Sequence, residues 1–164
     1  MSSSAQAGSQ PQPSPSEPPE VAQIISKALL ACINAKSLQM QLVKLMAEYA
    51  RTDRENILVV IDYYNELRDI VDRARELRAE LLSYIMYLAG KVPLNREDFL
   101  RVFTALNNVD FDKPESLIIT ILSDTFINTY INLLLSVQTM GTAPTQPIVL
   151  QIPVQPVQGG VNRP

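Results

Sequence analysis

Four arginines lie close together in the chain, and their type and spacing suggest a binding chemistry. They are Arg68, Arg73, Arg75 and Arg78. On a helix, Arg68 and Arg75 share one flank and Arg78 lies about one turn further, so their guanidinium groups could contact successive phosphates. Asp69 and Asp72 have helical spacing to the same arginines and would instead pair with them internally. Both interpretations are open, and the first would be a phosphate contact or, with the carboxylates of a neighbouring subunit, an intersubunit contact.

The residues on which most catalytic and metal sites depend are absent. The chain has no histidine and one cysteine, which removes the commonest general base and the usual zinc ligands. No glycine-rich phosphate loop is present either. Glu55, Asp62, Asp69 and Glu76 recur every seven residues and predict a solvated outer ridge. We therefore expect no enzyme activity, no metal site and no cofactor, and we expect Cys32 to be a buried structural thiol.

Prolines divide the chain into three parts. They crowd the Pro/Ser-rich segment 1–19 and return in segment 141–164, and both segments are therefore barred from forming helix. We interpret 1–19 as an N-terminal arm, 20–140 as a helical domain and 141–164 as an extended apolar C-terminal arm. The net charge of −3 gives no global attraction to nucleic acid, so any such contact must come from a local patch.

The helical domain is predicted to contain four helices. Two long helices fill the stretch 20–89, which has neither proline nor glycine, and Thr52 or Asp53 would cap the second. Gly90, which tolerates a positive φ, would end it. Asn95 starts a third helix and Asp112 caps a fourth that runs to Gly141. The fold class is all-α: an elongated helical hairpin plus two further helices, resembling a four-helix bundle, with extended Pro-rich arms at both ends.

A seven-residue rhythm links the two long helices. Apolar residues from Val21 to Tyr49 and from Ile57 to Leu88 fall at alternating spacings of three and four, which predicts a shared seam. Tyr64 and Arg78 occupy seam positions; Arg78 would either fix the register through a buried partner or extend to the edge of the core. The small residues around Cys32 would admit another helix, or the ring of Tyr63 or Tyr64.

Polar residues at a spacing of four interrupt the predicted fourth helix. Asp124, Asn128 and Asn132 belong to this row, and a charged residue at mid-membrane costs about 2.5 to 3.5 kcal/mol on insertion scales. We therefore expect no membrane span. Instead, Asn128 and Asn132 are predicted to lie at a helix or subunit contact.

Within the C-terminal arm, residues 144–160 are rich in apolar side chains and carry no charge, which is unusual for a soluble chain. Between Glu115 and Arg163 the one charged residue is Asp124. Apolar side chains alternate in an extended pattern among the prolines, which predicts that they cover a neighbouring subunit. The predicted subunit-interface residues of the arm are Ile148, Val149, Leu150, Ile152 and Val154.

The order of arm, two long helices, shorter helices and tail resembles, in architecture, the helical major capsid proteins of filamentous viruses of archaea. That resemblance implies a self-assembling coat protein located in the virion, with copies of itself or a related coat subunit as partners, and it implies DNA packaging. The alternative is a non-enzymatic cytoplasmic adaptor with disordered tails that uses the hairpin to bind its partner. A membrane-attached protein is a third reading.

Overall fold

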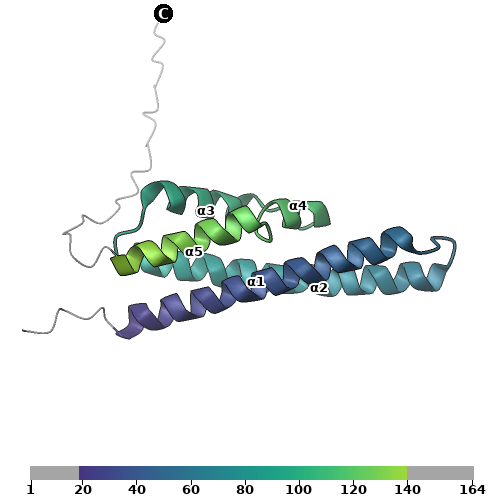
Figure 1. The fold of residues 1–164 in the computed structure, drawn as a ribbon, viewed down its shortest axis with the longest axis horizontal. Coiled ribbons are helices and arrows are strands. Elements are labelled where there is room, and N and C mark those ends of the chain that lie inside the picture. The colour runs from purple at the N-terminus through teal and green to yellow at the C-terminus, as the bar shows by residue number, and fades with distance from the viewer. Residues whose placement is uncertain (1–18, 140–164) are drawn as a thin grey trace, which may run out of the picture.

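The computed structural model describes residues 19–139, and within them the protein consists of helices and connecting turns without any strand (Figure 1). The helices are α1 (Pro19–Arg51), α2 (Ile57–Ala89), α3 (Arg96–Asn108), α4 (Pro114–Ile119) and α5 (Asp124–Thr139). The prediction of an all-α fold is confirmed. The two predicted arms, 1–19 apart from its last residue and 141–164, lie outside the described residues.

Helices α1 and α2 form the predicted hairpin, but the cap of α2 differs from the prediction. Asn56 is the N-cap, and its side chain accepts a hydrogen bond from the backbone N–H of Leu58 at 3.1 Å. Thr52 and Asp53 act earlier: the Thr52 hydroxyl donates to the carbonyl oxygen of Glu48, and Asp53 accepts from the N–H of Glu55. Both candidate side chains therefore make their hydrogen bonds within the turn that precedes α2 and do not cap the helix.

The seam of the hairpin is buried as predicted over most of its length. The buried residues of α1 and α2 are Val21, Ile25, Ala28, Ala31, Cys32, Ala35, Leu38, Leu42, Leu45, Leu67, Ile70, Ala74, Leu77, Leu81, Ile85 and Leu88. Ile57 and Tyr64 were predicted in the seam but are exposed. The hairpin tip, where α2 begins at Ile57, projects beyond the other helices (Figure 1), and Tyr64 lines a groove with Phe111 and Pro114 but stays 59% exposed.

The connection from α2 to α3 follows the predicted sites. Gly90 is the C-cap of α2 as expected, with φ −85°. Asn95 caps α3 as predicted, because its side-chain oxygen accepts from the N–H groups of Glu97 at 3.0 Å and Asp98 at 3.1 Å. The chain therefore reverses sharply and brings α3 back along the hairpin.

The predicted fourth helix is two helices, α4 and α5, separated by residues 120–123. Ser123 causes the restart, because its hydroxyl oxygen accepts from the N–H of Phe126 at 3.1 Å and so caps α5. The break turns Ile121 and Leu122 into the core, where both are fully buried. Asp112 was predicted to cap the fourth helix, but Lys113 holds the N-cap position of α4 and makes no side-chain hydrogen bond there.

Helix α5 closes the core by packing against α1 and α3. Its Tyr130 is fully buried, and the hydroxyl donates to the carbonyl oxygen of Leu81 on α2 at 2.7 Å. Burial, with a smaller contribution from Cys32, raises the pKa of the Tyr130 hydroxyl above its usual range. Of the two rings that were predicted to insert beside the small residues around Cys32, Tyr63 is half-buried and Tyr64 is exposed. Tyr63 instead stacks on Tyr49 with ring centroids 3.8 Å apart.

Candidate functional site

Arg78 holds α2 against α3. Its Nε donates to the carbonyl oxygen of Leu106 at 2.6 Å, and the side chain is half-buried. Leu106 lies in the last turn of α3, where carbonyl oxygens lack helical partners and the helix dipole favours a positive charge. This contact corresponds to the interpretation in which Arg78 fixes register through a buried partner.

Arg68 and Arg75 lie on one side of α2, as the spacing predicts, and line the same groove. Arg75 forms an ion pair with Asp72 at 3.2 Å and lies over the ring of Phe111, with 5.4 Å from its guanidinium carbon to the ring centroid. Arg68 forms no hydrogen bond or ion pair with any residue in the range 19–139. The internal-pair interpretation therefore fits Arg75, whereas Arg68 keeps its donors available.

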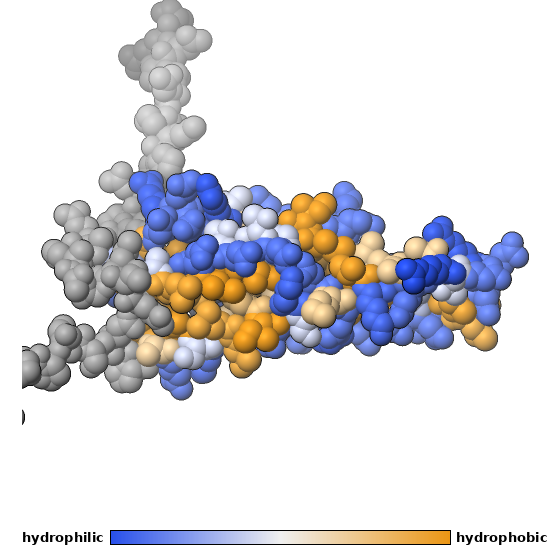
Figure 2. All heavy atoms as spheres, viewed as in Figure 1, coloured by the Kyte–Doolittle hydropathy of each residue, from blue (hydrophilic) through white to orange (hydrophobic). Residues whose placement is uncertain are grey.

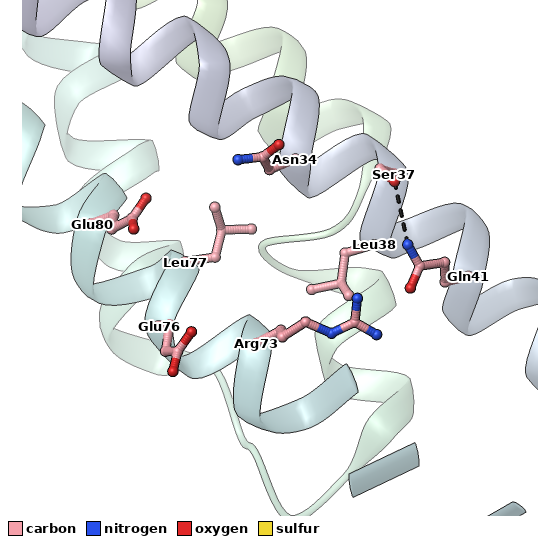
Figure 3. Close-up of a pocket in the computed structure, with 8 residues that line it drawn as sticks. All are labelled: Asn34, Ser37, Leu38, Gln41, Arg73, Glu76, Leu77 and Glu80. Atoms are coloured by element: carbon pink, nitrogen blue, oxygen red, sulfur yellow. Dashed lines mark hydrogen bonds between the residues drawn. The ribbon is translucent and has the colours of Figure 1, made fainter. Parts of the chain in front are cut away.

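Arg73 lies on a different surface from Arg68 and Arg75. It lines a shallow groove of about 250 Å³ between α1 and α2, and Figure 3 shows it extending from α2 toward the α1 side. Its Nε donates to the backbone oxygen of Asp69 at 3.3 Å, so the expected pair with the Asp69 carboxylate is not formed. The four arginines consequently do not form one basic patch.

The groove in Figure 3 offers little for catalysis. Polar side chains from both helices surround a floor of Leu38 and Leu77; they are Asn34, Ser37, Gln41, Arg73, Glu76 and Glu80. Gln41 donates to the Ser37 hydroxyl at 3.3 Å. No nucleophile is paired with a base there. Among residues 19–139, no three acidic or cysteine side chains come together as a metal site.

The acidic ridge and Cys32 have the environments that the sequence predicts. Glu55, Asp62, Asp69 and Glu76 are all exposed. Cys32 is buried and unpaired, and burial raises the pKa of its thiol to about 12. A thiol that stays protonated at neutral pH is a poor nucleophile. The acidic ridge is therefore a solvated face, and Cys32 is part of the core.

In the polar row of the predicted fourth helix, Asp124 has its partners on another helix. Asp124 forms an ion pair with Lys36 of α1 and accepts from Gln39 at 3.4 Å. The hydrogen bond from Lys36, supported by that from Gln39, lowers the pKa of the Asp124 carboxyl below its usual range. Asn128 and Asn132 are exposed on α5. Their predicted place at a subunit contact stays a prediction.

Helix α1 has a second apolar face, which is separate from the seam predicted between Val21 and Tyr49. Leu30, Ile33 and Met40 are 57%, 66% and 64% exposed, and Figure 2 shows hydrophobic surface over α1 and α5 on the face viewed. The signal was present in the spacing: Leu30, Ile33, Ser37 and Met40 also alternate between three and four. A helix with one apolar stripe in the core and another on its outer side has two packing surfaces.

The apolar composition of α1 raises the question of whether this helix could cross a membrane. By length and composition α1, over residues 20–51, could cross a membrane, and 39% of its most apolar window is buried. The core helix of a soluble protein has the same composition, so this is weak evidence. The predicted fourth helix, which had prompted the question, is divided at residues 120–123.

The predicted arm contacts Ile148, Val149, Leu150, Ile152 and Val154 lie outside the described residues. Comparison of the chain with models of protein families, with curated proteins and with solved structures finds no significant match.

Proposed function

We propose that this chain is a non-enzymatic structural subunit that assembles with copies of itself, as a coat protein in a virion, and that its C-terminal segment joins neighbouring subunits. One observation carries the proposal: the chain from Ser116 to Asn162 contains a single charged residue, Asp124. Asp124 is paired with Lys36. A stretch of this length without free charge is poorly suited to face water in an isolated monomer.

Apolar side chains on the outside of the helical body support the same proposal. Ile119 on α4 is 76% exposed and Ile57 on α2 is 70% exposed, in addition to the apolar face of α1. Scattered single exposures are normal on a monomer, but large exposed residues on several helices favour association. The class of assembly that we propose follows the architectural resemblance of the sequence to coat proteins of filamentous archaeal viruses.

DNA packaging is the less supported part of the proposal. Arg68 has no partner within the described residues, and Arg75 lies beside it in the same groove. Asp72 and Asp112 line that groove too, so its positive potential is reduced. We infer that any DNA contact needs several subunits, each presenting one Arg68, rather than a basic patch on one subunit.

Electron microscopy of the purified full-length chain, with and without double-stranded DNA, tests the proposal directly. We expect particles or filaments much larger than a dimer, formed at micromolar concentration. Sedimentation in parallel distinguishes assembly from aggregation by its reversibility on dilution. A protein that stays monomeric or dimeric under both conditions would favour the adaptor and overturn the coat function.

A further inference from the structure

The outer side of α1 carries a regular stripe that the described part of the subunit leaves uncovered. Its seven positions alternate between spacings of four and three, and all are exposed: Ser26, Leu30, Ile33, Ser37, Met40, Lys44 and Ala47. This is the spacing of the contact positions in a two-helix coiled coil, which keeps the stripe facing a partner helix. The stripe lies opposite the residues that α1 contributes to the core.

We infer that this stripe is a docking surface for a second copy of the chain, with two α1 helices packed antiparallel. In the register we propose, Leu30 faces Met40 of the partner subunit and Ile33 faces Ser37 of the partner subunit. The two-fold axis repeats both contacts. In each of the two copies the large side chain of Ile33 then lies opposite the small Ser37 of the partner subunit, which allows the two helices to pack closely.

Charge decides between the two directions. In a parallel, in-register pair Lys44 would face Lys44 of the partner subunit, and Arg51 would face its own copy. In the antiparallel pair Lys44 lies opposite Ser26 of the partner subunit and beside Lys27 of the partner subunit, while the acidic first turn with Glu20 meets the basic last turn with Arg51, so one attraction offsets one repulsion on each side of the two-fold axis. Like charges directly opposite one another oppose association, whereas antiparallel helix dipoles favour it.

The polar members of the stripe can be covered at little cost. The hydroxyl of Ser26 donates to the carbonyl oxygen of Ala22 at 3.0 Å, and that of Ser37 accepts from Gln41 at 3.3 Å. Lys44 is the one charged residue of the stripe and lies 3.7 Å from the carboxylate of Glu48. Its stem can lie along the partner helix while the ammonium group stays in water. Burial therefore leaves few unmatched polar groups.

This contact uses the helical body and not the C-terminal segment, so it goes beyond the proposed function and can be tested separately. In a Cys32→Ala background, one preparation carries Leu30→Cys and another carries Met40→Cys. Mixed under mild oxidation, they should form a disulfide-linked dimer. Each alone should not, because the two copies of either residue would be about 15 Å apart along the helices, beyond the reach of a disulfide. Asp62→Cys, on the outer ridge of α2, is the matched control partner.

A disulfide between two copies of Leu30→Cys would show a parallel pair and overturn the inference, as would the absence of any mixed dimer above the Asp62→Cys background. Sedimentation equilibrium provides a second measurement without cysteines. Ile33→Asp should weaken dimerisation at least tenfold, whereas Ile57→Asp, an equally exposed change at the hairpin tip, should not. Both variants should keep the parent helicity, because neither residue is buried.

Phospholipid vesicles separate the dimer from a lipid-binding face. If the parent chain floats with neutral or anionic vesicles, stays monomeric in solution and loses flotation through Ile33→Asp, the α1 face binds lipid and the dimer is wrong. The proposed coat function can fail separately from the dimer. If the chain forms the mixed disulfide but no large particle, the dimer inference stands and the coat function is wrong.

Discussion

Tyr130 of α5 donates from its buried hydroxyl to the carbonyl oxygen of Leu81 on α2, at 2.7 Å. This bond joins the last described helix to the hairpin through the centre of the core. Leu81 is itself fully buried, so water does not compete for the contact. It shows that α5 is an integral part of the subunit fold, whatever the residues after it do.

Removing this hydroxyl should destabilise the subunit without changing its fold. We expect Tyr130→Phe to lower the free energy of unfolding by about 1 to 2 kcal/mol, since one buried hydrogen bond is lost and a small void remains. Tyr64→Phe removes the same atom from an exposed ring and should have no measurable effect. Urea denaturation followed by circular dichroism measures both. Equal stability of the two variants would show that the bond contributes nothing.

Alkaline pH should unfold the protein partly through Cys32. Burial raises the pKa of its thiol from 9.0 to about 12 in the folded state. Below about pH 9 the thiol is protonated in both states, so its contribution to stability is complete there. As pH rises toward 12 the unfolded chain releases the proton first, and stability falls. Cys32→Ala should therefore lose less stability than the parent between about pH 8 and pH 11 in urea titrations. An identical decline in both would contradict this.

Arg78 should matter for stability rather than for binding. Arg78→Met keeps the aliphatic stem but removes the donor to Leu106, and we expect a loss of about 1 to 2 kcal/mol because α3 loses its charge-assisted terminal contact. Arg73→Met, in the exposed groove between α1 and α2, is the control and should change stability by less than about 0.5 kcal/mol. Chemical denaturation compares the two. If Arg73→Met costs as much, the contact with α3 is not the cause.

Much of the fold could be predicted because local signals and packing agree. The seam from Leu67 to Leu88 follows the apolar spacing, and Asn95 caps α3 as its sequence position indicates. The break before Asp124 could not be predicted in the same way, since no glycine or proline marks it. It forms because Ile121 and Leu122 gain burial, and Ser123 supplies the new cap. Tertiary packing here overrides an uninterrupted apolar run.

The candidate binding residues were harder to interpret for a related reason. Helical spacing correctly placed Arg68 beside Arg75. It could not supply the partner of Arg78, because the carbonyl oxygen of Leu106 is 28 positions away and meets Arg78 only when α3 folds back. The outer stripe of α1 was readable from its spacing, but the exposure of Ile33 and Met40 had to come from the structure.

Arg68 and Arg75 should contribute to nucleic-acid binding only if the groove they line contacts phosphate. In that case changing both to Gln should weaken DNA binding at unchanged helicity. The slope of the logarithm of the binding constant against the logarithm of salt concentration should fall by the release of about two counterions. Arg51→Gln with Arg73→Gln removes the same charge from other surfaces and should change the salt slope less. Fluorescence anisotropy over a salt series measures the slopes. Parent protein that does not bind DNA would return both arginines to a structural role.

The C-terminal segment should be needed for assembly and not for folding. It lies outside the described residues, whereas Tyr130 and Leu134 belong to the one core cluster formed by buried residues of the helical body. Truncation after Gly141 should therefore leave a helical, cooperatively melting subunit that no longer forms large particles. Leu150→Asp should weaken assembly in the same direction, because one buried Leu contributes about 1.5 to 3 kcal/mol, and Gln151→Asp adds the same charge on the other side of the extended segment as its control.

Light scattering against concentration and thermal melts give two separate readings of these variants. If the truncated chain loses cooperative melting, the segment belongs to the subunit's own core, and the assembly role is wrong. Normal particles from the truncated chain would show that contacts other than the arm build the assembly, since the two-fold α1 contact alone closes at a dimer. Equal effects of Leu150→Asp and Gln151→Asp would mean that added charge anywhere in the segment blocks assembly, which contradicts a contact made through one apolar side of an extended arm.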